Sequence, residues 1–208
     1  MSTFLKAIQK PLSVTIAMLA LCGLAYPLLL TGISQIVFPK QANGSIITAD
    51  GKSVGSELIG QDFTDARFMK SRPSAVNYNT YTEEDKESGS YPGIGSGSKN
   101  YAPTNPELIK RIETDMDAFL AANPSAKKED IPTDLLTASG SGLDPHISPA
   151  SAAVQIPTLA EATGLSEETL GNIVKENTQG KFLGIFGEEI VNVLMVNLDI
   201  SKELGLLG

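Results

Sequence analysis

The chain has 208 residues, and its 16 basic against 24 acidic residues give a formal net charge of -8 at neutral pH. This charge argues against a nucleic-acid-binding protein, which needs a basic surface to neutralise phosphates. The single cysteine excludes a disulfide framework within the chain and a paired-cysteine metal or redox site.

The first predicted element is a transmembrane helix over residues 11–39, a segment without any charged residue. At about 1.5 Å per residue, a helix of this length exceeds the ~30 Å of hydrocarbon in a bilayer. The alternatives are a cleaved signal peptide and a lipoprotein modified at Cys22. The apolar run continues well past the candidate cleavage site at Ala25, and Leu21 stands where a lipoprotein needs a small residue. We therefore expect a retained anchor.

Charge on the two sides of this helix predicts its orientation. Residues 1–10 carry two lysines and no acid, whereas residues 40–208 carry all 24 acidic residues against fourteen basic ones. Short basic tails stay in the cytoplasm, and long domains cross the membrane largely regardless of charge. We expect residues 1–10 to be a cytoplasmic tail and residues 40–208 to lie outside, in the periplasm or the extracellular space of a bacterium. The span has no ionisable side chain, so it offers no ion or proton site of its own.

The first half of the outer domain predicts a hairpin followed by a long loop. Two short β-type runs, at Ile46–Ile47 and near Val54–Ile59, flank a turn signal at Asp50-Gly51. Residues 72–105 are rich in Asn, Ser, Gly, Tyr and Pro, a composition typical of a surface loop. The acidic block EEDKE within it is interpreted as a solvated segment.

The second half predicts three helices and one strand. Helix signals are an Asn105 cap with a stop at Asn123-Pro124, a Ser148 cap with a kink at Pro157 and a stop at Gly164, and a Ser166 cap leading to about Asn177. The first of these helices has an apolar stripe spaced to pack on a core. The apolar run Val191–Leu198 is expected to be a buried strand. Few strands with three helices that do not alternate regularly with them favour one compact α+β domain over residues 40–208.

The segment Thr137–Pro149, TASGSGLDPHISP, is the candidate site because it holds the chain's only histidine. Ser139, Ser141, Asp144 and His146 are the residue types of a nucleophilic site, and they define one alternative, a membrane-anchored periplasmic hydrolase. No sequence pattern fixes a serine against the imidazole, so we interpret the segment as a glycine-permitted turn leading to the Ser148 cap and assign no catalytic residue.

Metal and nucleotide sites have still less support in this segment. A lone histidine without nearby thiolates is a poor metal site, so no metal ligands are assigned. The GSGL sequence lacks the following lysine of a phosphate-binding loop, and no other nucleotide motif occurs. Cofactor-binding residues therefore stay unassigned.

Five sequence segments together resemble the KdpC family, the C subunits of bacterial high-affinity potassium-transporting P-type ATPases. They are GSELIGQDF from Gly55, RPSA from Arg72, APTNPEL from Ala102, TASGSGLDPHISPASA from Thr137 and GEEIVNVLMVNL from Gly187. The segments follow the family's order along nearly the whole chain. Two departures stand out: Thr80 to Gly95 looks like a local insertion, and Glu189 and Ile190 replace a usual Pro-Arg pair.

The resemblance implies a non-catalytic accessory subunit in the bacterial inner membrane. Its implied partners are a channel-like potassium subunit, an ATP-hydrolysing P-type subunit and a small membrane peptide. The family description adds a catalytic chaperone role that raises the ATP affinity of the hydrolysing subunit, a part in assembly, and ATP binding. With the domain outside, only about ten residues face the ATP, too few for a nucleotide pocket. We therefore expect ATP to associate with the complex and its effect to pass through the membrane helix.

Overall fold

The computed structural model describes residues 2–90 and 93–207, with side chains from Ala7 onward. The chain divides into two compact units, Met1–Ile46 and Ile47–Gly208. The first unit is helical, and the second combines short strands with helices. This agrees with the expected α+β domain that follows one long apolar helix in the sequence.

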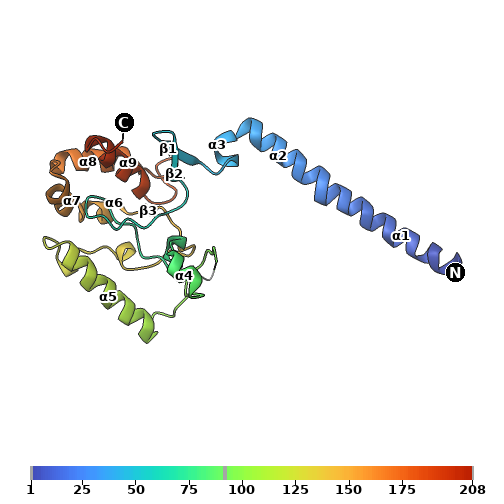
Figure 1. Ribbon diagram of the computed structural model, residues 1–208, viewed down its shortest axis with the longest axis horizontal. Coiled ribbons are helices and arrows are strands. Elements are labelled where there is room, and N and C mark those ends of the chain that lie inside the picture. Colours follow the sequence, from blue (N-terminus) through green and yellow to red (C-terminus); the bar gives the residue numbers. More distant parts are fainter. Residues whose placement is uncertain (1, 91–92, 208) are drawn as a thin grey trace. The chain divides into compact units, whose positions relative to one another are not determined.

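The first unit is dominated by one long helix (Figure 1). It runs through α1 (Ser2–Met18), a π-helical segment (Leu19–Ala25) and α2 (Tyr26–Val37), and the short α3 (Pro39–Ala42) follows. The 31 residues from Ala7 to Val37 are long and apolar enough to cross a membrane. Their side chains are exposed along almost the entire length, which suits contact with lipid or with other helices.

The π-helical segment has a local cause. Pro27 has no N–H, so it cannot donate to the carbonyl of Gly23 four residues earlier. Just before it, the Tyr26 N–H donates to the Leu21 carbonyl, one residue further back than in an α-helix. The proline therefore widens the helix near the middle of the apolar stretch.

The predicted hairpin is confirmed. Strands β1 (Ile46–Ala49) and β2 (Lys52–Ser56) pair with each other. Both turn residues are left-handed, with φ of 50° at Asp50 and 73° at Gly51. This conformation suits Asp-Gly and matches the twist of two-residue hairpins.

A second, three-stranded sheet has the antiparallel order β3-β5-β4. Its strands are β3 (His146–Ile147), β4 (Thr178–Gln179) and β5 (Ile190–Asn192). Val191 of the central strand pairs with Ile147 on one side and Thr178 on the other. The sheet thus brings the candidate segment beside a strand more than forty positions later in the chain.

The three predicted helix caps are all present. The side chains of Asn105, Ser148 and Ser166 accept from the backbone N–H groups of Glu107, Ser151 and Thr169. They open α5 (Pro106–Ala122), α6 (Pro149–Ala153) and α8 (Glu167–Glu176). The kink expected at Pro157 separates α6 from α7 (Ile156–Thr163), because the proline ring clashes with the carbonyl four residues earlier. Gly164 ends α7 with φ of 74°.

The apolar stripe of α5 packs less deeply than expected. All its members, Leu108, Ile112, Met116, Phe119 and Leu120, are half-buried, and no residue of α5 is buried. Part of this face is occupied by a loop, since Arg111 donates to the Leu136 carbonyl over 3.2 Å.

The segment 72–105, expected to be a surface loop, contains regular structure as well. It holds a 3-10 turn (Asn77–Asn79) and the short helix α4 (Glu83–Glu87), which the acidic block forms.

The predicted strand over Val191–Leu198 is wrong. Strand β5 ends at Asn192, and helix α9 (Val193–Glu203) follows. The Asn192 side chain caps this helix by accepting from the Met195 N–H over 3.2 Å. Val193, Val196 and Ile200 then recur at helical spacing and are almost completely buried. A short apolar run does not distinguish a buried strand from a buried helix, and here the cap and the burial of one helical face together favour the helix.

The hydrophobic core lies where β3 and β5 meet helices α6 to α9 (Figure 1). Its most deeply buried members are Met69, Ile147, Ala152, Leu159, Leu170, Val191, Val193, Val196 and Ile200. The polar side chain of Asn197 is also buried there. Asn197 accepts from the Met69 N–H over 2.7 Å and donates to the Met69 carbonyl over 2.9 Å. This pair of bonds ties the irregular segment around residue 69 to α9.

Candidate functional site

An ion pair and a histidine share one carboxylate at the centre of the candidate segment. Arg72 Nη1 donates to Asp144 Oδ2 over 2.9 Å. The other oxygen, Oδ1, accepts from the His146 backbone N–H over 3.0 Å and lies 3.2 Å from His146 Nδ1. The side chains of Arg72 and Asp144 are only 19% and 29% exposed, so this cluster is largely shielded from water.

The cluster stabilises the ionised form of Asp144. Burial by itself raises the pKa of this carboxyl, but the hydrogen bonds from His146 and the charge of Arg72 outweigh it and lower the pKa. Arg72 also donates from Nε to the Thr137 carbonyl over 3.3 Å. Its guanidinium therefore joins both ends of the segment Thr137–Asp144.

Three distant parts of the chain hold this segment in place. Ser74 Oγ donates to the Gly142 carbonyl over 2.6 Å, and the Gly60 N–H donates to the Leu143 carbonyl over 2.8 Å. The Gly97 N–H donates to the Ser141 carbonyl over 2.7 Å. Three segments that are distant in the sequence therefore meet at this turn.

Two glycines allow this close packing. A Cβ atom on Gly60 would lie 2.6 Å from both the Asp144 carbonyl oxygen and Tyr78 Cε1. Gly142 has φ of 67°, and a Cβ there would lie 2.7 Å from the Gly97 carbonyl oxygen. No side chain fits such distances without displacing backbone, so glycine is required at both positions for steric reasons.

The predicted residue types for a hydrolase come together only in part. Asp144 orients His146 as in a catalytic dyad, but both serine hydroxyls are used within the turn. Ser139 Oγ accepts from the Gly142 N–H over 2.8 Å, and Ser141 Oγ accepts from the Leu143 N–H over 3.1 Å. Within residues 2–90 and 93–207, no hydrogen bond joins either hydroxyl to His146. The geometry is that of a braced turn and lacks a base-activated nucleophile.

The sequence did not point to Asp134, whose carboxylate holds the C-terminal end of the candidate segment in place. Its Oδ2 accepts from the Ser148 N–H over 2.7 Å, and its Oδ1 accepts from the Ser151 hydroxyl over 2.7 Å. Burial raises the pKa of Asp134, but these bonds outweigh it and lower the pKa. Asp134 lies fourteen positions before Ser148 in a 3-10 turn (Thr133–Leu135), and no local pattern marks it as a partner.

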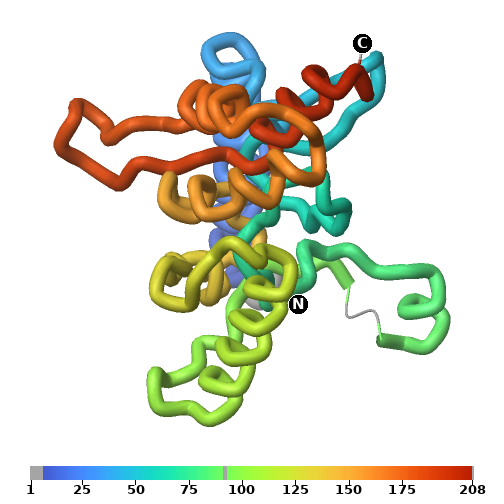
Figure 2. The backbone as a smooth tube through the Cα atoms, turned by 90° about the vertical axis from the view of Figure 1, so that its left-hand side faces the viewer, coloured from blue at the N-terminus to red at the C-terminus, as the bar shows by residue number. Residues whose placement is uncertain are grey.

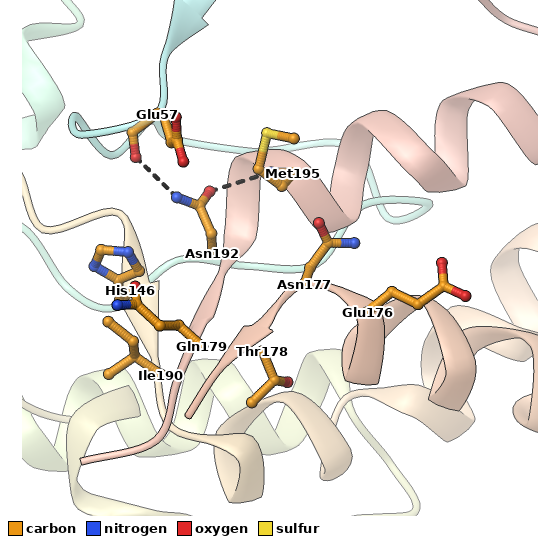
Figure 3. Close-up of a pocket in the computed structure, with 9 residues that line it drawn as sticks. All are labelled: Glu57, His146, Glu176, Asn177, Thr178, Gln179, Ile190, Asn192 and Met195. Atoms are coloured by element: carbon orange, nitrogen blue, oxygen red, sulfur yellow. Dashed lines mark hydrogen bonds between the residues drawn. The ribbon is translucent and has the colours of Figure 1, made fainter. Parts of the chain in front are cut away.

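A small polar cavity of about 230 Å³ lies beside His146 (Figure 3). Asn192 and Glu57 line it, and Asn192 Nδ2 donates to the Glu57 carbonyl over 2.8 Å. The remaining lining residues are Glu176, Asn177, Thr178, Gln179, Ile190 and Met195. Its volume is below that of typical drug-sized ligand sites, so it suits waters or a very small polar molecule. Of the residues described, no group of three or more His, Cys, Asp or Glu side chains could hold a metal ion.

A second hollow, of about 410 Å³, also has His146 in its lining, together with Arg72, Asp134, Asp144 and Glu189. His146 therefore borders two cavities. Its side chain is 24% exposed, so it remains accessible to a contacting group. His146 is therefore placed to contact another group. The charge of its acidic partner, Asp144, is already balanced by Arg72.

Comparisons with known proteins point to one family over almost the whole chain. The KdpC family model, described as K+-transporting ATPase, c chain, matches residues 8–202. The potassium-transporting ATPase KdpC subunit of Clostridium kluyveri is 73% identical over 208 residues, covering 100% of this chain and 99% of that protein. The protein of the same name from Clostridioides difficile is 58% identical, with 98% and 100% covered. The one from Caldanaerobacter subterraneus is 46% identical, with 95% of each chain covered.

Proposed function

The chain belongs to the KdpC family, and we propose that it is a non-catalytic accessory subunit of an ATP-driven potassium uptake complex. The observation that carries this proposal is the match to potassium-transporting ATPase KdpC subunits along the full length of the chain. The braced turn around Asp144 is compatible with this role, because Arg72, Asp144 and His146 bond one another and the backbone. The proposed partners are a channel-like potassium subunit, an ATP-hydrolysing subunit and a small membrane peptide.

We also propose that the N-terminus lies in the cytoplasm and the α+β domain outside the membrane. The support is the basic, acid-free stretch of residues 1–10 before the apolar helix. In this orientation the α+β domain cannot reach cytoplasmic ATP. ATP then associates with another subunit of the complex, and this chain acts on its binding from a distance.

The proposed action is that of a catalytic chaperone that raises ATP affinity through the membrane helix. A helix transmits such an effect when it packs differently in two states of the complex. The π-helical segment Leu19–Ala25 supports this role, since interruptions of this kind occur frequently at functional positions in helices. A coupling free energy of about 1 to 3 kcal/mol would change ATP affinity by roughly 5- to 150-fold.

The direct test compares the complex purified with and without this chain. We expect loss of potassium-stimulated ATPase activity, or weaker ATP binding by the hydrolysing subunit, when the chain is absent. A complex that pumps normally and binds ATP equally well without the chain would contradict the proposal.

Transmission through the helix has its own test. Pro27→Leu restores the missing N–H and should convert the π-helical segment to α-helix, shifting the ATP dependence of the assembled complex. Pro11→Leu, in α1, is the matched control and should leave that dependence unchanged. Equal behaviour of the two variants would exclude the π-helical segment as the transmitting element.

A further inference from the structure

The segment between β4 and β5 carries a cluster of exposed apolar side chains. Phe182, Leu183, Ile185 and Phe186 are 70%, 74%, 75% and 62% exposed, and every residue from Lys181 to Glu189 is exposed. Figure 2 shows this segment as a long hairpin, orange to red, projecting from the helices around it. We call Lys181–Glu189 the apolar finger. Four large apolar side chains gathered at one exposed tip are typical of an interaction site.

The finger has a defined backbone. The Phe182 N–H donates to the Phe186 carbonyl over 2.8 Å, and the Phe186 N–H donates to the Phe182 carbonyl over 3.0 Å. Gly184, with φ of 74°, allows the tight turn between them. Because the turn is closed by its own hydrogen bonds, its apolar side chains are held outward. Such preorganisation lowers the entropy lost on binding.

The base of the finger is anchored in the core. Its returning arm becomes β5, the central strand, where Val191 is fully buried and paired on both sides. Asn192, the next residue, pairs with His146 and borders the cavity beside it. A partner that holds the tip would therefore be connected through β5 to the braced turn.

We infer that the apolar finger docks into an apolar socket, rimmed by basic side chains, on another protein subunit of the same membrane complex. The inference rests on the proposed function, which makes this chain one subunit of several, and it assigns residues to one of their contacts. The apolar tip would supply the apolar area buried on binding. The acidic residues Glu188 and Glu189 at the base of the finger would favour a socket surrounded by basic side chains.

The charges on the finger favour a protein over a lipid surface. Glu188 and Glu189 outnumber Lys181, whose Nζ is 3.8 Å from Glu188 Oε2. Segments that lie in the membrane interface usually carry Lys or Arg, which attract anionic lipids, together with Trp or Tyr. Residues 181–189, KFLGIFGEE, contain no Trp or Tyr and have an excess of acid. A rim of Lys or Arg side chains complements this charge.

The first test replaces the tip in the full complex. In Phe182→Ser/Ile185→Ser, we expect at least a tenfold drop in the amount of this chain that co-purifies with the tagged ATP-hydrolysing subunit. Ile94→Ser is the matched control, since Ile94 is 86% exposed outside the finger. This control should co-purify normally. Normal retention of the double variant would overturn the inference.

The second test identifies what touches the tip and does not depend on the double variant folding. Leu183→Cys, in a Cys22→Ser background, is labelled with a benzophenone maleimide, and the assembled complex is irradiated. A crosslink to another subunit supports the inference, whereas crosslinks to lipid alone, or none, overturn it. If tip variants assemble and pump normally while complexes lacking the chain do not, the docking inference fails and the proposed function stands.

Discussion

Arg72 and Asp144 lie 72 positions apart in the sequence, and their side chains form a 2.9 Å ion pair that closes the segment carrying the only histidine. The same carboxylate orients His146 through its other oxygen. One acidic side chain thus couples the RPSA segment to strand β3.

Breaking this pair should destabilise the α+β domain. Arg72→Met leaves the shielded Asp144 carboxylate without its cation, and we expect a loss of about 1 to 3 kcal/mol in the free energy of unfolding. Urea unfolding of the detergent-solubilised chain measures this loss. Arg67→Met is the control, because the pair of Arg67 with Asp65 is much more exposed. Equal effects of the two substitutions would show that the Arg72–Asp144 pair has no special role.

Lowering the pH should weaken the domain through Asp134 and Asp144. Both carboxyls have a lowered pKa in the folded state, so the unfolded state, with an ordinary pKa of about 3.9, takes up protons first as the pH falls. The stability they contribute is complete above the unfolded pKa and is lost as pH falls through the folded pKa. Urea midpoints measured from pH 7 to pH 3 test this.

Asp134→Asn should flatten that pH dependence and lower stability at pH 7, because an amide nitrogen cannot accept from the groups that now bond to the carboxylate. Asp130→Asn, at an exposed acid in a neighbouring turn, serves as its control. A pH profile that Asp134→Asn leaves unchanged would show that Asp134 does not contribute to the pH dependence of stability.

Gly60→Ala should disrupt the braced turn. The added methyl group would lie 2.6 Å from the Asp144 carbonyl oxygen, so the backbone must shift, at a cost of about 1 to 3 kcal/mol. Gly171→Ala is the matched control inside α8, where nothing lies within 4 Å of the new methyl group. This control should stabilise the helix by about 1 kcal/mol. Thermal unfolding of both variants gives the comparison, and a neutral Gly60→Ala would contradict the close packing described for this position.

The proposed topology predicts opposite labelling of the N-terminal tail and the α+β domain. In a Cys22→Ser background, Ser125→Cys should react with a membrane-impermeant maleimide in cells whose outer membrane has been opened. Thr3→Cys should react only after lysis. The reverse pattern would place the domain in the cytoplasm and would make direct contact with ATP possible.

The sequence determined the elements whose causes are local. An uncharged apolar run predicted the long N-terminal helix, Asp50-Gly51 predicted the hairpin turn, and Asn105, Ser148 and Ser166 predicted three helix starts. Each depends on side chains within a few positions of one another. The order of the motifs along the chain likewise indicated the KdpC family, because it depends only on which residues follow one another.

Tertiary structure decided what depends on residues far apart. Val191–Leu198 contains enough β-branched residues for a strand, but burial of Val193, Val196 and Ile200 at helical spacing against the core makes it mostly helical. Only folding brings Arg72 to Asp144 and leaves the apolar finger exposed. Local propensities amount to fractions of a kcal/mol per residue, whereas burial and charge pairing act between segments whose proximity no local pattern encodes.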